Sequence, residues 1–380
     1  MEYGAEPHKG GTGPAAWAEI DLTALRRNFA VARQLARGRR VIPVVKADAY
    51  GHGAARVAGP LVRAGADALA VAMLEEALEL RALGIDTPIL LMQGLRGAHE
   101  ADLALARRTT PAVSHAGQLE WLESAAARAG VRLGVHVKLD TGMGRLGFPL
   151  ADLDAVLDRI SRCAHLVLEG VMTQLAESER PEGEPTVQQR ARFAAAVARV
   201  RERGFAPPCV HADPSGGLLG GPTDVATAVR PGLLIYGGDP RAERRAEVEP
   251  VMSLRCRAIH VRDVPAGFRI GYGGTYVTPR ATRIVTLPLG YADGLPRGAG
   301  GRWKVLVDGV PAPLVGRVSM DLAAVDVGPE SPSGIGSEVL VFGRQGAQRL
   351  PVEQLAEALG SIAHEVLTGI GPRVPRVATG

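Results

Sequence analysis

The sequence predicts an α/β barrel followed by an all-β domain, and three observations support this prediction. The chain has 380 residues, which exceeds what one hydrophobic core usually supports, so two domains are expected. Before residue 246, short apolar runs alternate with amphipathic segments, as in a (β/α)8 TIM-like barrel. After residue 247, strand-like runs follow one another without long helices between them, which indicates a β domain.

The barrel strands are expected to be short, apolar and rich in β-branched residues. They are predicted at 41–46, 68–73, 88–93, 109–113, 134–139, 168–173, 209–212 and 233–236. Amphipathic helices are predicted between them, the first of them capped by Asp21 or Thr23. These helices span 22–36, 74–82, 116–127, 150–161 and 186–203. The rival architecture, a doubly wound sheet, is disfavoured because no Gly-x-Gly-x-x-Gly follows the first strand.

The predicted boundaries place the barrel at 17–246 and the β domain at 247–380, with the short strand 17–21 as an alternative member of the β domain. Residues 1–16 are rich in Gly and Pro, lack an apolar core, and are predicted to be a disordered tail. In the second domain, strands are predicted at 253–261, 282–287, 304–307, 323–327 and 338–342, and helices at 352–359 and 363–368.

Composition excludes several classes of function. The 44 Lys and Arg residues nearly balance 40 Asp and Glu residues, and no basic run with interleaved aromatic residues appears, so no nucleic-acid partner is predicted. No apolar run is long enough to span a membrane. Three scattered cysteines, Cys163, Cys209 and Cys256, argue against a disulfide framework or a zinc ribbon and fit a reducing cytoplasm. The histidines show no metal-ligand spacing, so no metal site is predicted. Three of them are interpreted as structural or supporting residues: His52, His211 and His260.

Lys46 ends the first predicted barrel strand and is the first candidate for chemistry. A lysine at this position is partly removed from water, which lowers the pKa of its amine. A neutral amine is a nucleophile suited to a Schiff base with a carbonyl cofactor. Tyr50 and two glycines follow, and the glycines allow the backbone to approach a ligand closely.

Further polar groups follow the other barrel strands, where the active site of a barrel forms. Lys138 and Arg145 belong to the segment after the fifth strand, and Arg230 precedes the eighth. Ser215, followed by two glycines, offers a hydroxyl and backbone N–H groups that form a nest for a phosphate. A Schiff-base lysine and a phosphate nest in one barrel predict pyridoxal 5'-phosphate (PLP) as the cofactor.

From residue 17 to residue 376, the sequence resembles the alanine racemases, a PLP-dependent family of the barrel type. Six segments carry the resemblance, in the order in which the family has them. They are Val-Val-Lys46-Ala-Asp-Ala-Tyr50-Gly-His-Gly, Lys138-Leu-Asp-Thr-Gly-Met-Gly-Arg145-Leu-Gly, Arg230-Pro-Gly, Gly271-Tyr272-Gly-Gly-Thr-Tyr276, Gly290-Tyr291-Ala-Asp-Gly and Gly316-Arg-Val-Ser-Met320-Asp321.

The resemblance implies a two-base racemisation of alanine that supplies D-alanine for peptidoglycan. Lys46 would bind the cofactor and act as one base, and Tyr272 would be the other base, contributed by the second subunit of a head-to-tail homodimer. One base removes the α-proton and the other returns a proton on the opposite face. Arg230 would face the pyridine nitrogen and keep it unprotonated, because a guanidinium does not give up its proton. That arrangement disfavours transamination.

The resemblance also implies cofactor-binding and substrate-binding residues. Arg145 would contact the phenolic oxygen of the cofactor and the substrate carboxylate, and Lys138, which resembles a lysine that many members carbamylate, would position it. The phosphate would be held by Tyr50, Ser215 and the backbone N–H groups near Gly232 and Leu233. The substrate entrance would be formed by Tyr291, Met320 and Asp321, with Met320 also near the substrate carboxylate.

Three positions depart from the family pattern. Gln174 stands where the family usually has a histidine that bonds the pyridine-facing arginine, and an amide cannot take up a proton. Pro214 replaces the usual asparagine before Ser215 and removes a donor from the phosphate loop. Pro372 occupies a position where some members have a phosphate-binding tyrosine.

Several alternatives share the barrel. A serine, broad-specificity or basic amino-acid racemase would differ in its entrance residues, and a slow paralogue that binds alanine-like inhibitors is consistent with Gln174. A non-catalytic PLP-binding barrel would lack the β domain that carries Tyr272. A fold-related decarboxylase would need a carboxylate at the pyridine nitrogen and a late catalytic cysteine, and Arg230 and Tyr272 are the wrong residues for those roles.

Overall fold

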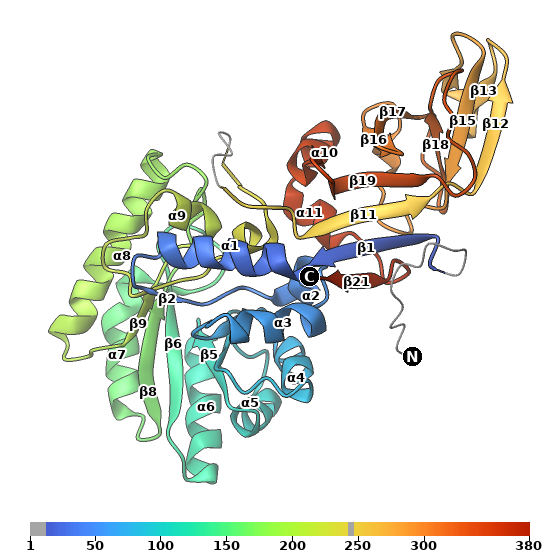
Figure 1. Cartoon of the computed structure of the whole chain (residues 1–380). Coiled ribbons are helices and arrows are strands. Elements are labelled where there is room, and N and C mark those ends of the chain that lie inside the picture. Colours follow the sequence, from blue (N-terminus) through green and yellow to red (C-terminus); the bar gives the residue numbers. More distant parts are fainter. Residues whose placement is uncertain (1–12, 242–246) are drawn as a thin grey trace. The chain divides into compact units, whose positions relative to one another are not determined.

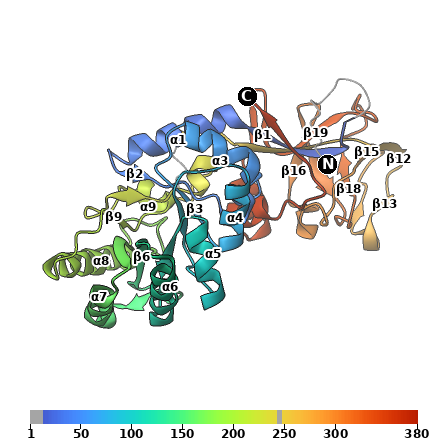
Figure 2. The same cartoon turned by 90° about the horizontal axis from the view of Figure 1, so that it is seen from below.

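The computed structural model describes residues 13–241 and 247–380, and the chain divides into two compact units. The barrel unit comprises residues 25–50 and 54–248, and the β unit comprises residues 13–24, 51–53 and 249–380. Figure 1 and Figure 2 show the elements of both units. Most of the predicted tail, 1–16, lies outside the described residues, and β1 begins at Ala16. The predicted domain boundaries stay a prediction.

Parallel strands form the barrel sheet in the order β2-β10-β9-β8-β6-β5-β4-β3. The order closes on itself because Val44, which follows β2, bridges Ala70 of β3 in parallel, and the Val45 N–H donates to the Ala70 carbonyl at 2.8 Å. The strands are β2 (Arg40–Val41), β3 (Leu69–Val71), β4 (Ile89–Leu91), β5 (Thr109–Val113), β6 (Leu133–Asp140), β8 (Leu166–Met172), β9 (Cys209–His211) and β10 (Ala228–Val229), and β7 (Phe148–Pro149) pairs with β6.

Two predicted barrel strands need correction. The segment predicted as the strand 41–46 bonds to neighbouring barrel segments through the N–H groups of residues 42, 44 and 45, but β2 ends at Val41 and Lys46 begins α2. Pro43, which has no N–H, interrupts the regular ladder. The segment 233–236 was wrongly predicted to be the eighth strand: it is a short 3-10 helix, η3 (Leu233–Tyr236), and β10 supplies the eighth strand. All four residues of η3 are buried, and a short, fully buried apolar run has no periodicity that separates helix from strand.

The helices lie outside the barrel strands, with α6 and α7 beside β6 and β8 (Figure 1, Figure 2). Asp21 caps the first helix, since its Oδ1 accepts hydrogen bonds from the N–H groups of Thr23 and Ala24 at 2.8 and 2.9 Å. The helices are α1 (Leu22–Leu35), α2 (Lys46–Tyr50), α3 (Ala54–Arg63), α4 (Leu74–Ala82), α5 (Ala101–Ala106), α6 (Ala116–Ala129), α7 (Leu153–Arg162), α8 (Glu184–Glu202) and α9 (Ser215–Leu219), with short 3-10 turns η1 (Ala98–Glu100) and η2 (Leu150–Asp152).

The β unit is a mostly antiparallel sheet in the order β12-β15-β18-β17-β16-β19-β11-β1-β21, with β20 beside β19 and a separate hairpin of β13 and β14. The predicted strand 253–261 is two strands, β11 and β12, which pair with different neighbours. The elements are β1 (Ala16–Asp21), β11 (Met252–Arg257), β12 (His260–Val264), β13 (Arg269–Ile270), η4 (Tyr272–Gly274), β14 (Tyr276–Val277), β15 (Thr282–Leu287), η5 (Arg297–Ala299), β16 (Lys304–Val307), β17 (Val310–Val315), β18 (Ala323–Asp326), β19 (Glu338–Gln345), β20 (Gln348–Leu350), α10 (Val352–Leu359), α11 (Ala363–Thr368) and β21 (Arg376–Thr379).

Within the described ranges, no helix has both the length and the apolar character needed to cross a membrane.

Candidate active site

Lys46 lies where the first barrel segment ends, and its amine is partly buried. Burial lowers the pKa of the Lys46 amine, the positive charge of Arg145 lowers it further, and the carboxylate of Glu76 acts in the opposite direction. A lowered pKa increases the fraction of neutral, nucleophilic amine at a given pH. This is the property that a Schiff-base lysine requires.

The four residues after Lys46 form a left-handed turn, with φ angles between 51° and 55° at Ala47, Asp48, Ala49 and Tyr50. This conformation costs L-amino acids about 1–2 kcal/mol per residue, so contacts must hold it. The Ala47 N–H donates to Glu76 Oε1 at 2.7 Å, and Asp48 Oδ1 accepts from the backbone N–H at the start of α3 at 2.6 Å. Tyr50, the last residue of this turn, is buried.

Tyr50 is buried and stacks on Tyr236, with ring centroids 5.0 Å apart. The Tyr236 hydroxyl in turn donates to the Val44 carbonyl at 2.9 Å, which ties the pair to the first barrel segment. Burial raises the pKa of Tyr50 to about 12, so this residue is a neutral phenol near pH 7 and its hydroxyl can donate a hydrogen bond.

Ser215, Gly232 and Tyr50 converge on one place. Ser215 Oγ accepts hydrogen bonds from the N–H groups of Gly232 and Leu234 at 3.0 and 3.1 Å. A Cβ on Gly232 would lie 2.3 Å from the Tyr50 hydroxyl oxygen, so only glycine fits there. Because Ser215 Oγ accepts from both amides, its own O–H, like the Tyr50 hydroxyl, can donate to an anionic oxygen group. Leu234, whose amide helps to orient the Ser215 hydroxyl, was not predicted and follows the predicted Leu233.

Arg230 is 2% exposed and makes four contacts through its guanidinium. Nη2 donates to the Thr173 carbonyl at 2.8 Å, to Gln174 Oε1 at 3.3 Å and to the Ala212 carbonyl at 3.3 Å, and Nη1 contacts Nδ1 of His211. Burial lowers the pKa of Arg230 to about 10, which leaves the side chain cationic at neutral pH. A buried cation held by carbonyls and neutral side chains can place a fixed donor against a ligand atom.

Gln174 occupies the position that departs from the family pattern, and a second glutamine fixes its backbone. Gln189 Nε2 donates to the Gln174 carbonyl and to Thr141 Oγ1, both at 3.1 Å, and Gln189 Oε1 accepts from the Ala176 N–H at 2.8 Å. Gln189 lies on α8, far along the chain, and nothing in its local sequence signals this role.

Lys138 and Arg145 lie on either side of a loop that Asp140 organises. Asp140 Oδ1 accepts hydrogen bonds from the N–H groups of Gly142 and Met143 at 2.9 Å. Burial raises the pKa of Asp140, but these backbone hydrogen bonds outweigh it and the net shift is downward. Burial lowers the pKa of Lys138 to about 8, and the charges of Arg230, Arg145 and Lys46 contribute. The positive charges of these three predicted site residues therefore act on Lys138 and lower its pKa.

Asp213 was not predicted as a site residue, although it anchors the segment that carries Ser215. Its carboxylate is fully buried and accepts from the Thr223 N–H and hydroxyl at 2.8 and 2.9 Å and from Arg190 Nη2 at 3.2 Å. Pro214 has no N–H group to donate, and the bonds of Asp213 hold the loop in its absence. An acidic residue directly after a buried strand is the signal that could have found it.

In the β unit, Tyr272 lies between the hairpin strands β13 and β14 and is 69% exposed. Gly271 and Gly273 on either side have φ angles of 72° and 74°, which glycine adopts at little cost. A Cβ on Gly271 would meet Arg317 backbone atoms at 3.4 and 3.5 Å, so the Tyr272 turn packs against the segment that leads to Met320.

Tyr291, Met320 and Asp321 also come together in the β unit. The Ala292 N–H donates to the Met320 carbonyl at 3.0 Å, and a Cβ on Gly290 would lie 2.1 Å from that carbonyl oxygen. Asp321 Oδ1 pairs with Arg373 Nη1 at 2.8 Å. Tyr291 and Met320 are 44% and 53% exposed. The predicted residues therefore form two groups, a mostly buried one in the barrel unit, where Arg145 is exposed, and an exposed one in the β unit.

Comparisons with known proteins match two family models to this chain, one after the other. Residues 20–240 match the family "Alanine racemase, N-terminal domain", and residues 251–378 match "Alanine racemase, C-terminal domain". The alanine racemase of Syntrophobacter fumaroxidans is 40% identical over 358 residues, covering 93% of this chain and 95% of the relative.

Solved structures show the same similarity. The alanine racemase from D-cycloserine-producing Streptomyces lavendulae has a TM-score of 0.92 at 34% identity, with 97% of this chain and 98% of that chain covered. The alanine racemase from Bartonella henselae with covalently bound pyridoxal phosphate has a TM-score of 0.88 at 27% identity, with 97% and 100% covered.

Proposed function

We propose that this chain, which belongs to the alanine racemase family, is a PLP-dependent enzyme that interconverts L-alanine and D-alanine. The observation that carries the proposal is Lys46, a lysine at the start of α2, just after the first barrel segment, whose amine pKa is lowered by burial and by Arg145. The family match over most of the chain supplies the substrate class, and the D-alanine would serve peptidoglycan synthesis in the cytoplasm.

The barrel residues fit PLP in three respects. Lys46 would provide the amine for the covalent attachment, and Tyr50, Ser215 and the backbone N–H groups near Gly232 and Leu233 would provide hydrogen-bonding groups for its phosphate. Arg230 provides a cationic donor for its pyridine nitrogen, which suits a ring nitrogen that stays unprotonated. When bound, PLP withdraws electrons from the substrate α-carbon and so acidifies its C–H bond.

Two bases on opposite faces of the substrate would then exchange the α-proton. Lys46 takes or returns the proton on one face once its amine is neutral, which the lowered pKa favours. The phenol of Tyr272 does the same on the other face, and we assign it to the second subunit of a head-to-tail homodimer because it is 69% exposed on its own chain. Arg145 orients the substrate carboxylate, with Lys138 as its neighbour, and Tyr291, Met320 and Asp321 form the entrance.

The test is incubation of the purified, PLP-loaded protein with L-alanine in D₂O, with Lys46→Ala as the control. D-Alanine that carries α-deuterium, produced by the wild-type protein alone, supports two-base racemisation. Exchange of deuterium without inversion would show that the Lys46 side works and the tyrosine side does not. No exchange in protein that has bound PLP would overturn alanine as the substrate, and a panel of serine, lysine and arginine would then identify the racemised amino acid.

Gln174 sets an expectation for the rate of the proposed reaction. Its amide accepts a hydrogen bond from Arg230 but cannot take up a proton, so we expect the step at Tyr272 to be slower, or shifted in pH, relative to an enzyme with histidine here. Gln174→His should move the pH–rate profile and raise kcat up to about 10-fold. A profile that superimposes on that of the wild type would contradict this role for Gln174.

A further inference from the structure

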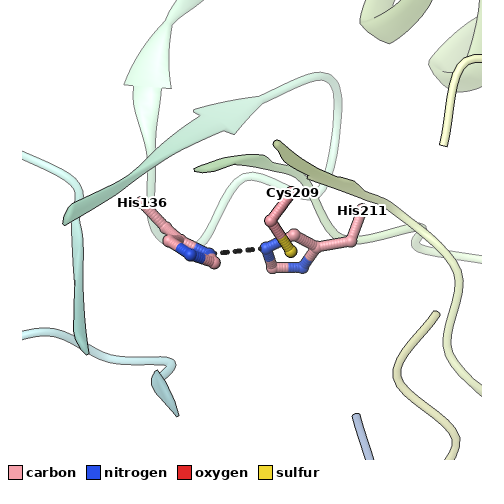
Figure 3. Close-up of side chains that lie close together, drawn as sticks. All are labelled: His136, Cys209 and His211. Carbon is pink, nitrogen blue, oxygen red and sulfur yellow. Dashed lines mark hydrogen bonds between the residues drawn. The ribbon is translucent and has the colours of Figure 1, made fainter. Parts of the chain in front are cut away.

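Three buried side chains form a row that leads from Arg230 into the barrel. Arg230 Nη1 contacts His211 Nδ1, and His211 Nε2 lies 2.7 Å from His136 Nδ1. His211 is fully buried and His136 is 6% exposed. Figure 3 shows the two imidazoles facing each other, with Cys209 beside His211. His136 was not among the predicted site residues, because a histidine within a strand gives no signal of its partners.

Arg230 at one end of the row and His136 at the other define the direction of its hydrogen bonds. A guanidinium only donates, so in the observed arrangement His211 Nδ1 is the acceptor and carries no proton. Burial, with the charge of Arg230, lowers the pKa of His211 well below its usual value and that of His136 to about 3, so both rings are neutral. A neutral imidazole carries one proton. His211 therefore carries it on Nε2 and donates to His136 Nδ1.

The same residues have the spacing of metal ligands, since one ligand atom each from His136, Cys209 and His211 lies within 4.8 Å of the others. Two features argue against a cation. A metal ion on His211 Nε2 would displace the proton from that nitrogen. The proton could not move to Nδ1, because Nδ1 accepts from Arg230, so the ring would have no neutral form. In addition, burial raises the pKa of the Cys209 thiol to about 11, and metals bind the thiolate.

The space for the His136 ring is built into the neighbouring strand. A Cβ on Gly170 of β8 would lie 2.5–2.6 Å from the atoms of this ring, so glycine is required for the imidazole to occupy its position. Beyond the ring, His136 and Cys209 line a cavity of about 360 Å³ at the amino ends of the barrel strands. The ring thus has a defined position between Gly170, His211 and this cavity.

We propose that His136 is a positioning residue for the reaction. By accepting the hydrogen bond from His211 Nε2, it fixes the tautomer in which His211 Nδ1 accepts from Arg230, and so it holds the guanidinium in place. The inference rests on the proposed function, in which Arg230 faces the cofactor ring. Without an acceptor at position 136, His211 can carry its proton on Nδ1, where it would oppose the N–H groups of Arg230 and displace them.

The first test measures the tautomer and needs no activity. In full-length protein labelled with 15N-histidine, the His211 signals, assigned by comparison with His211→Gln, should show a proton on Nε2 and none on Nδ1. His136→Gln keeps an acceptor and should preserve this tautomer, whereas His136→Leu should produce the Nδ1–H form or a mixture. A wild-type His211 with its proton on Nδ1 would overturn the proposal, whether or not the protein racemises alanine.

The second test uses the PLP-loaded enzyme. We expect His136→Leu to lower kcat about 10- to 100-fold with a smaller change in KM, and to alter the absorption spectrum of the bound cofactor, because residues that orient a reactive group typically contribute this much. His136→Gln should restore most of kcat. Cys209→Ala, which alters the same cavity without entering the row, is the matched control and should stay within about twofold of the wild type.

The outcomes separate the two proposals. If His136→Leu folds and retains wild-type kcat and spectrum, or if Cys209→Ala has the same effect as His136→Leu, the positioning role is wrong. If His136→Leu does not fold, the tautomer of His211 in the wild type and in His136→Gln still tests the positioning role, and an Nδ1–H form in either protein contradicts it. A wild-type protein with the expected tautomer but neither PLP binding nor racemisation would disprove the proposed function and leave the hydrogen-bonded row established.

Discussion

The two groups of candidate residues differ in how their positions are fixed. In the barrel unit, Arg230 is 2% exposed and its guanidinium is held by two backbone carbonyls, Gln174 and His211. In the β unit, Tyr272 is 69% exposed and stands on a turn between two glycines with positive φ. One group is organised by side chains of its own unit, and the other is presented on a surface.

This difference indicates where each group obtains its environment. A buried guanidinium has already lost its hydration and keeps a fixed position before a ligand binds, which is how preorganised electrostatic sites work. An exposed phenol is hydrated, and only a second surface can remove that water. The exposure of Tyr272 is the feature that the proposed second subunit would account for.

The largest expected effect comes from mixing two inactive variants. Lys46→Ala and Tyr272→Phe should each reduce kcat at least about 100-fold, because each removes one of the two bases. If Tyr272 acts on the barrel of the partner, mixed dimers carry one intact site out of two, and the mixture should recover about a quarter of the wild-type activity. Measured turnover after dissociation and reassociation provides the readout.

The control for the mixing experiment is each variant taken alone through the same procedure. No recovery from the mixture, combined with proven exchange of subunits, would place Tyr272 in the site of its own chain. The exposed Tyr272 would then not need a second subunit to reach the reacting atoms.

The next effect concerns the phosphate-binding residues of the barrel. Gly232→Ala would place a Cβ 2.3 Å from the Tyr50 hydroxyl oxygen, so Tyr50 must move, and overpacking of this kind costs about 1–3 kcal/mol. We expect PLP affinity to fall about 10- to 100-fold, as measured by equilibrium dialysis of the cofactor. Gly334→Ala, where a Cβ meets no atom within 4 Å, is the matched control and should bind PLP as the wild type does.

The sequence allowed the position of the candidate barrel residues to be predicted better than the position of the residues that hold them in place. Lys46, Tyr50, Ser215 and Arg230 follow or precede barrel strands, and strand ends are readable from apolar runs, so their convergence could be anticipated. Residues such as Gln189 and Asp213 support them across long chain separations, and a hydrogen bond between distant segments leaves no local pattern.

Local geometry was the other part that the sequence did not reveal. The run 233–236 was read as a strand because every residue is apolar, and the left-handed turn after Lys46 consists of alanine, aspartate and tyrosine, which rarely adopt positive φ. In both cases tertiary contacts override the intrinsic preferences of the residues, and the glycines that follow are the only local signal.

A pH effect on stability tests the electrostatics of the barrel group. The pKa of Lys138 is lowered to about 8, from 10.5, chiefly by burial and then by Arg230. Between these values the unfolded chain binds more protons than the folded one, so the free energy of unfolding rises with pH across this window and is reduced below it. We expect an increase of about 1–2 kcal/mol between pH 8 and 9.5, measured by urea unfolding in CO₂-free buffer.

Lys138→Met is the matched variant for the pH experiment, because it keeps much of the volume and cannot titrate. It should be more stable than the wild type at pH 7, and the difference should shrink as the pH approaches 10. Parallel pH profiles for the two proteins would show that Lys138 is hydrated and that this part of the barrel group is less buried than the comparison requires.

The smallest effect concerns the strain in the turn that carries Tyr50. Ala47 is exposed and has a φ of 51°, and glycine adopts this conformation without the steric cost of a Cβ. Ala47→Gly should therefore raise the free energy of unfolding by about 1 kcal/mol, whereas Ala30→Gly, at an exposed position within the right-handed helix α1, should lower it by a similar amount. Urea unfolding of both variants gives the sign. If Ala47→Gly destabilises the protein as Ala30→Gly does, the left-handed turn is not strained in solution, and the placement of Tyr50 owes more to contacts such as its stacking on Tyr236.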